Sequence, residues 1–280
     1  MSSTDAQWAR IEPLLPDRTP RRSGRWRDHR QVIDAIAFKY RTGTPWMDLP
    51  EHFGSWKGAH IRLRKWARRH LGAPVHHPAR PGRRRRRPRL DRRGRLHDHP
   101  RASARRRGPS KGAPAGEPDD HALGRSRGGL TTKIHLAADS RCRPLAFVLT
   151  PGQAGDTPAF PAVMARIRVP RPVGRPRTTP DVVLADKAYS SRAIRPQLRQ
   201  RGIRAVILQP SDQAANRKRR GRLGGHPPAF DREAYKRRNT VRRCINKLKQ
   251  WRGLATRYDK TATIYLAGLH IAAIFIWSAR

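Results

Sequence analysis

The stretch DVVLADKAYSS, residues 181–191, opens with a short apolar run, DVVLA. This run is followed directly by an acidic residue, Asp186. An aliphatic run of this length is typical of a buried strand in a parallel sheet. A helix capped by one of the two closing serines and ending at Gly202 fits the residues that follow, with Pro196 shortening or kinking it. The next apolar run, IRAVILQP at 203–210, predicts a second buried strand, so this region forms a strand-helix-strand unit.

Two further strands are expected before this unit. GGLTTKIHLAAD at 128–139 alternates Ile134 and Leu136 with other residues, and RPLAFVLTPG at 143–152 ends in a Pro-Gly turn signal. A long helix is expected from about Asp231, because apolar residues recur there at helical spacing. That stripe consists of Val241, Cys244, Ile245 and Leu248. This order of elements predicts an α/β fold with a mixed sheet.

Residues 1–69 have a helical pattern instead. The cap candidates Ser3 and Thr4 stand at the start of a first helix. Apolar residues then repeat at helical spacing in two segments: Trp8, Ile11 and Leu15, and after them Ile33, Ile36, Ala37 and Tyr40. Thr44 followed by Pro45 predicts another helix start, with Pro at the first helical position.

The last N-terminal helix is expected over KGAHIRLRKWARR, residues 57–69. Its apolar face consists of Ala59, Leu63 and Trp66. Its basic residues, which we predict to contact DNA, are Arg62, Arg64, Lys65, Arg68 and Arg69. A helix-turn-helix unit presents its recognition helix to phosphates and groove edges in this way. The alternative is a solvated basic face on a small helical bundle.

The charge of the chain favours a nucleic-acid partner. A formal net charge of +43 over 280 residues implies a polyanion, DNA or RNA before a membrane surface. The apolar tail at 263–277 is shorter than the ~20 residues that span a bilayer and predicts a buried helix. With no signal-like stretch near Met1 and only two distant cysteines, Cys142 and Cys244, we expect a cytoplasmic protein associated with the nucleoid.

Residues 70–109 differ from the rest of the chain. They hold fourteen arginines against two aspartates, many prolines and almost no aliphatic residues. Such a segment cannot bury a core of its own, and it lacks aromatic residues on which bases could stack. The composition predicts a disordered phosphate-binding arm.

Reactive groups in an open α/β sheet collect at the carboxyl ends of strands, which makes Asp186 a candidate. The alternative is an ordinary turn or helix-capping aspartate. Further on, Tyr235, Arg238, Arg242 and Lys249 are spaced to share one face of the expected long helix. A polar face on a basic helix is ordinarily in contact with solvent or with the DNA backbone.

Several long stretches resemble the bacterial insertion-sequence DDE transposases of the insertion sequence five group. They are TGTPWMDLPEHFGSW, AGEPDDHALGRSRGGLTTKIHLAAD, RPLAFVLTPGQAGDTPAFPAV, LADKAYSS and AYKRRNTVRRCINKLKQWRGLATRYDKTA. The resemblance implies a helix-turn-helix domain at 1–69 and a ribonuclease-H-like domain at 110–280 that binds transposon-end and target DNA. It also implies two Mg²⁺ ions held by three carboxylates, which activate the attacking oxygen and stabilise the leaving one. The resemblance is compatible with a homo-oligomer and does not imply a membrane partner.

Carried over residue by residue, the resemblance is incomplete. Asp186 fits the second acidic position, with Tyr189 as its supporting residue. Tyr235, Arg238 and Lys249 fit the supporting positions of the third motif. The Glu of that motif is replaced by Arg242, whose guanidinium cannot ligate Mg²⁺ and repels it.

The first acidic motif should lie on the strand before residue 129, inside the arginine-rich segment. Asp91 and Asp98 are there, but their surroundings are not strand-like. Permitted codons for 89–109, translated one nucleotide out of frame, give a β-strand that ends in Asp-Ser-Thr and resembles the missing first motif. We therefore hypothesise two compensating frameshifts that flank 70–109 and leave the fold without an intact first strand, which is central in the implied fold.

The sequence thus predicts a DDE transposase homologue that binds DNA and has lost catalysis. One alternative is an active transposase, which the overall resemblance favours and Arg242 opposes. The other is a basic nucleic-acid-binding protein without enzymatic activity, with the arginine-rich segment as its arm.

Overall fold

The computed structural model describes residues 3–15, 27–68, 121–126, 129–171 and 173–279. The arginine-rich segment, the expected first acidic strand and Arg69 lie outside the described residues.

The N-terminal part is helical, as predicted. Its helices are α1 (Asp5–Ile11), α2 (His29–Thr42) and α3 (Trp56–Trp66), with the 3-10 turns η1 (Glu12–Leu14), η2 (Trp46–Asp48) and η3 (Glu51–Phe53). Thr4 caps α1, since its hydroxyl accepts a hydrogen bond from the backbone N–H of Gln7, whose side chain reciprocates. The expectation at Thr44 and Pro45 is wrong, because Pro45 is the cap of a single 3-10 turn and not the first residue of an α-helix.

The first sheet is antiparallel and contains β1 (Gly124–Ser126), β2 (Gly129–Ala138) and β3 (Pro144–Pro151). The β2–β3 hairpin predicted from the sequence is confirmed, with Ile134 opposite Leu149 and His135 opposite Val148. The turn η6 (Thr157–Ala159) and α4 (Phe160–Ala165) follow, and α4 packs against both strands.

The strand-helix-strand unit is confirmed as β4 (Val182–Ala185), α5 (Ile194–Gln200) and β5 (Arg204–Ile207), and the two strands are parallel. The turn η7 (Lys187–Tyr189) lies between β4 and α5, and the Ser191 hydroxyl accepts a hydrogen bond from the backbone N–H of Ile194. The prediction that β4 is buried is wrong, because all four of its residues are partly exposed. Within the described ranges β4 pairs with β5 alone.

The strands were expected in one mixed sheet, and the described strands form two. One is the antiparallel sheet β1-β2-β3, and the other is the parallel pair β4-β5. In the part of the chain that the structure describes, no ladder of hydrogen bonds connects them. The strand expected to lie at the centre of the sheet belongs to the segment outside the described residues.

The C-terminal half is helical: α6 (Ser211–Arg219), η8 (Gly221–Gly224), α7 (Arg232–Lys236), α8 (Asn239–Lys249), α9 (Arg252–Ala255) and α10 (Ala262–Ser278). The single long helix expected from about Asp231 is wrong. Asp231 caps α7, and the chain then passes through two non-helical residues before α8 begins. The apolar stripe of α8 is confirmed at Cys244 and Leu248, which are buried.

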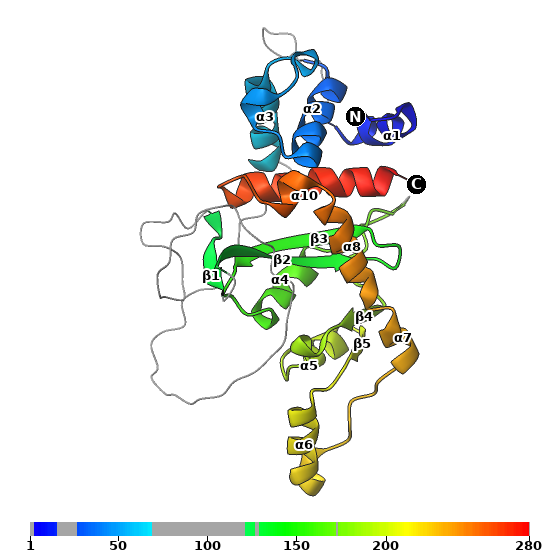
Figure 1. The fold of residues 1–280 in the computed structure, drawn as a ribbon. Helices are drawn as coiled ribbons and strands as arrows, with labels where there is room; N and C mark the ends of the chain where they lie inside the picture. Colours follow the sequence, from blue (N-terminus) through cyan, green and yellow to red (C-terminus); the bar gives the residue numbers. More distant parts are fainter. Residues whose placement is uncertain (1–2, 16–26, 69–120, 127–128, 172, 280) are drawn as a thin grey trace.

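Helix α10 is the centre of the main hydrophobic core. It lies between the N-terminal helices and the β2–β3 sheet, and it contacts α1, α2, α3, α8, α9 and β3 (Figure 1). The prediction that the apolar tail is a buried helix is confirmed, since most of its side chains are inaccessible to solvent. Within the described ranges, no helix has the length and apolar character needed to cross a bilayer.

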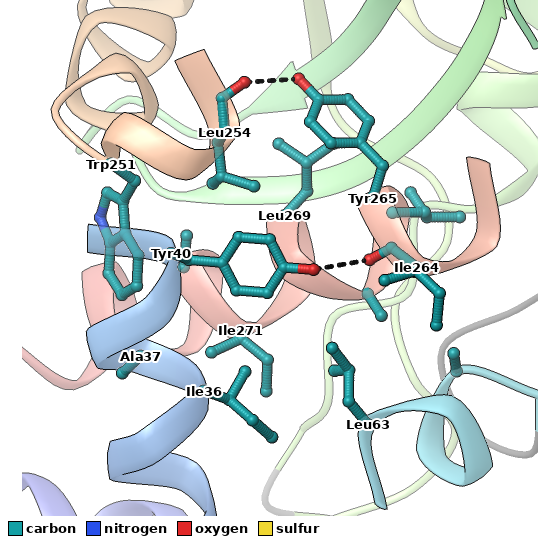
Figure 2. Packing of buried hydrophobic residues seen from close by; sticks show 14 of the residues in the cluster. Ile36, Ala37, Tyr40, Leu63, Trp251, Leu254, Ile264, Tyr265, Leu269 and Ile271 are labelled. Carbon is teal, nitrogen blue, oxygen red and sulfur yellow. Dashed lines mark hydrogen bonds between the residues drawn. The ribbon is translucent and has the colours of Figure 1, made fainter. Parts of the chain in front are cut away.

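Tyr40 of α2 fixes how α10 packs. Its side chain is fully buried, and its hydroxyl donates a hydrogen bond of 3.1 Å to the backbone carbonyl of Ile264 (Figure 2). The ring lies directly over Gly268, where an added Cβ would come within 2.4 Å of the ring. Next to it, the buried Lys39 ammonium contacts the Asp259 carboxylate at 3.0 Å, which anchors the loop that leads into α10.

We predict that Gly268→Ala destabilises the chain by about 1 to 3 kcal/mol, because the new methyl group forces the Tyr40 ring out of its place. Urea and thermal denaturation would measure the loss. Gly58→Ala in α3 is the matched control, since its Cβ would meet only an Arg27 nitrogen at 3.6 Å. The control should be neutral or stabilising by up to ~1 kcal/mol. Equal stability of the two variants would contradict this packing.

Candidate functional site

Asp186 lies at the carboxyl end of β4, where the chain turns into η7. One carboxylate oxygen accepts a hydrogen bond of 2.7 Å from the backbone N–H of Lys187. The side chain therefore caps a turn, which is the alternative to a catalytic role that the sequence left open. Asp186 is also partly exposed to solvent at the edge of the parallel pair.

Tyr189 lies beside Asp186 and is largely buried against Phe160, with ring centroids 5.8 Å apart. Burial raises the pKa of the Tyr189 phenol well above its ordinary value, and the charges of Asp156 and Asp186 raise it further. The phenol is therefore neutral at physiological pH and within electrostatic reach of both carboxylates.

The α7–α8 segment brings three of the predicted residues to this place. Tyr235 is buried, and the Arg238 guanidinium lies over its ring at 4.3 Å from the centroid. Burial raises the pKa of Tyr235; Arg238 and Arg242 lower it, and Asp186 raises it. All three charged groups therefore act on the same phenol, and Arg242 itself is exposed.

Lys249 does not join this group. It is the last residue of α8, seven residues beyond Arg242, which is about 10 Å along a helix axis. It borders a small apolar cavity lined by Ile134, Ile245, Leu248, Leu254, Ala255, Tyr265 and Leu269. The prediction that Lys249 shares one helix face with Tyr235, Arg238 and Arg242 is therefore wrong. Lys249 lies at the apolar cavity, and the other three lie near Asp186.

The residues at this site do not fit two Mg²⁺ ions. Magnesium requires several hard oxygen ligands, and the described residues supply the Asp186 carboxylate with a guanidinium at the position expected for Glu. Glu233 is exposed on α7 and pairs with Lys236 at 2.8 Å. In the described ranges, no group of three or more His, Cys, Asp and Glu residues is placed to hold a metal ion.

A second polar cluster, not predicted from the sequence, lies on the β2–β3 hairpin. His135 is buried and shares a hydrogen bond of 2.7 Å with the Thr150 hydroxyl, while its other ring nitrogen is 4.0 Å from Asp156. Lys133 donates to the Ala154 carbonyl at 2.7 Å and contacts Asp156 at 3.4 Å. Burial lowers the pKa of His135, so the imidazole is neutral at pH 7. The polar residues at 133 and 135, two apart on one face of a strand, were the signal for this cluster.

The predicted DNA-binding helix is α3, and its basic residues differ in their surroundings. Arg62 is turned inward, with its guanidinium 3.2 Å from the His29 ring nitrogen and 5.8 Å from the Trp66 ring centroid. Arg64, Lys65 and Arg68 are exposed. The link from α2 to α3 covers residues 43–55, which is longer than the turn of about 3 to 4 residues in a helix-turn-helix.

Two family models match the sequence. The model described as "Putative transposase of IS4/5 family" matches residues 4–76. The model described as "Transposase DDE domain" matches residues 89–276, which is more than half of the chain. This chain belongs to the DDE transposase family. The resemblance inferred from the sequence motifs is confirmed, and the DDE match spans both Asp186 and the α7–α8 segment.

Proteins of two bacteria are similar to this DDE-family chain. "Putative transposase for insertion sequence element IS6501" of Brucella ovis is 30% identical over 153 residues, covering 53% of this chain and 98% of that protein. "Putative transposase for insertion sequence element IS402" of Burkholderia cepacia is 31% identical over 146 residues, covering 52% of this chain and 62% of that protein. No solved structure matches the chain.

The arrangement around Tyr235 can be tested by titration. Asp186→Asn should lower the pKa of Tyr235, because the carboxylate raises it, and Arg242→Gln should raise it, because the guanidinium lowers it. Carbon-13 NMR of the tyrosine rings would follow both changes. Lys249→Gln is the control and should leave the pKa in place, since Lys249 lies at the far end of α8. The same shift in all three variants would contradict this geometry.

Proposed function

We propose that this chain is an insertion-sequence DDE transposase homologue that binds transposon-end DNA and does not cut or join it. The observation that carries the proposal is Arg242, which occupies the Glu position of the third motif and acts on the same phenol as Asp186. The family of the chain supports the proposal that it binds transposon-end DNA. The positive charge of Arg242 supports the proposal that it does not cut or join that DNA.

The loss of catalysis follows from electrostatics. Two-metal chemistry depends on carboxylates that hold both ions close together on either side of the reacting phosphate. A guanidinium at one of these positions removes a ligand and adds a positive charge that repels the ion. Arg238 adds another positive charge beside Tyr235, so two guanidiniums act on the phenol that the Asp186 carboxylate also acts on. Both positive charges suit a DNA phosphate.

We propose that the first acidic position was lost to two compensating frameshifts flanking 70–109. The two family matches, at 4–76 and 89–276, extend into the arginine-rich segment from both ends and support an origin in a transposase gene.

DNA binding is assigned to the domain at 1–69, with α3 as the recognition helix of a variant helix-turn-helix. Arg64, Lys65 and Arg68 are exposed on that helix and can reach phosphates, whereas Arg62 supports the helix from inside. The domain at 110–280 would carry the remnant of the catalytic site. We place the protein in the bacterial cytoplasm, bound to the nucleoid through DNA. This function is compatible with a homo-oligomer.

A second candidate function is that of a basic nucleic-acid-binding protein without a transposase role. The net charge of +43 and the fourteen arginines at 70–109 favour it. The two candidates differ in which part of the chain supplies the affinity. Deleting 70–109 should leave most of the affinity for transposon-end DNA if the first candidate is correct, and should remove most of it if the second is correct.

The experiment uses a duplex that carries the inverted ends flanking the gene, with a shuffled duplex as control. We expect tighter binding to the ends than to the shuffled duplex, no nicking or strand transfer with Mg²⁺, and a thermal melt that Mg²⁺ leaves unchanged. Arg242→Gln, which removes the positive charge without restoring a carboxylate ligand, should remain inactive. Nicking by the unaltered chain, or a clear rise of its melting temperature with Mg²⁺, would overturn the proposed loss of catalysis.

A further inference from the structure

A basic projection extends from the parallel strand pair. We call residues 211–224, which form α6 and η8, the basic arm; it points away from the rest of the molecule (Figure 1). Its cations are Arg217, Lys218, Arg219, Arg220 and Arg222, and its one acidic residue is Asp212 in the first turn of α6. Of the carboxylates in the described ranges, none forms an ion pair with these five cations.

The base of the arm is tied to the loop that carries Asp186. The Gln213 side chain donates a hydrogen bond of 2.7 Å to the Ser190 backbone carbonyl and accepts one of 3.0 Å from the Ser190 hydroxyl. Arg195 donates to the same hydroxyl at 3.2 Å and to the Ile207 carbonyl at 2.8 Å. Two hydrogen bonds therefore join the arm to the buried Ser190, and Arg195 ties that serine to the end of β5, so the base of the arm is held in a defined direction.

The tip of the arm is closely packed on itself. Gly224 of η8 lies against α6, where an added Cβ would clash with the backbone carbonyl of Arg217. Arg219 donates to the Asn216 side chain, which fixes one of the cations. Lys218, Arg220 and Arg222 are exposed, and Leu223 beside them is 91% exposed. The structure thus holds several cations together at a distance from the body, where they repel one another.

A cluster of uncompensated cations is stabilised by a polyanion that brings phosphates to it. Both Asp186 and α6 follow the carboxyl ends of parallel strands, so the arm and the remnant site begin at the same edge. From Gln213 to Arg220 the helix rises about 10 Å, which corresponds to about 3 base pairs of a duplex. The arm is therefore long enough to contact about 3 base pairs of a duplex that lies at the Asp186 edge.

We propose that the basic arm is a second DNA-binding surface, separate from α3, that grips the phosphate backbone of duplex DNA beside the Asp186 site. The inference rests on the proposed function, because it takes DNA to be the partner. Its contacts are to phosphates, so it adds affinity without sequence preference.

The test compares two variants of the full chain that lose the same charge. The arm variant is Lys218→Gln, Arg220→Gln and Arg222→Gln. The control variant is Arg168→Gln, Arg171→Gln and Arg175→Gln, three exposed cations in the loop between α4 and β4. Binding of a short mixed-sequence duplex is measured between about 50 and 200 mM salt, where each phosphate contact contributes ~0.9 to the slope of log K against log salt. The arm variant should lose about 2 to 3 from that slope, and the control less than 1.

A second measurement needs no loss of charge. Both native cysteines are buried, so Leu223→Cys, or Val173→Cys in the control loop, gives one exposed thiol for a photoreactive label. The label at 223 should cross-link to the duplex and the label at 173 should not. A parent chain that fails to bind duplex DNA overturns both this inference and the proposed function. A parent that binds, with equal slopes for the two variants and no cross-link from 223, overturns the basic arm alone.

Discussion

The packing of the Tyr40 ring on Gly268 is the contact on which the rest of the structure depends. It joins α2 to α10, and α10 in turn supports β3 and the helices α8 and α9. The contact requires a glycine, since any side chain at 268 would occupy the place of the ring. A buried hydroxyl also needs a partner, and the backbone carbonyl of Ile264 supplies it (Figure 2). The N-terminal helices and the C-terminal helix consequently share one continuous core.

This core also sets the geometry of the site around Asp186. Helix α8 packs on α9, α10 and β2 through Cys244 and Leu248, and its first turns carry Arg242 toward Asp186. The position of the guanidinium is therefore determined by hydrophobic packing far from it. Under the proposed function, this one substitution replaces a ligand for a cation with a group that attracts an anion.

Much of this could be predicted from the sequence, where local patterns decide the outcome. The β2–β3 hairpin, the parallel pair and the buried tail follow from periodicity and turn signals. The grouping of Asp186 with Tyr189, Tyr235 and Arg238 was implied by the family resemblance. The break between α7 and α8, which divides Lys249 from the others, has no proline or glycine to signal it. The partner of His135 on β3, and the hydrogen bonds that tie Gln213 to Ser190, are long-range contacts that no local pattern contains.

We propose that this chain descends from a complete transposase and has lost two of its three catalytic carboxylates. The most direct measurement is to read the nucleotides of the gene across codons 70–110 and to translate all three frames. We expect the frame one nucleotide along to be uninterrupted and to encode a strand that ends in Asp-Ser-Thr, in register with the residues that follow. Stop codons in that frame, or the absence of an acidic motif, would contradict the account and make the arginine-rich segment a genuine part of the protein.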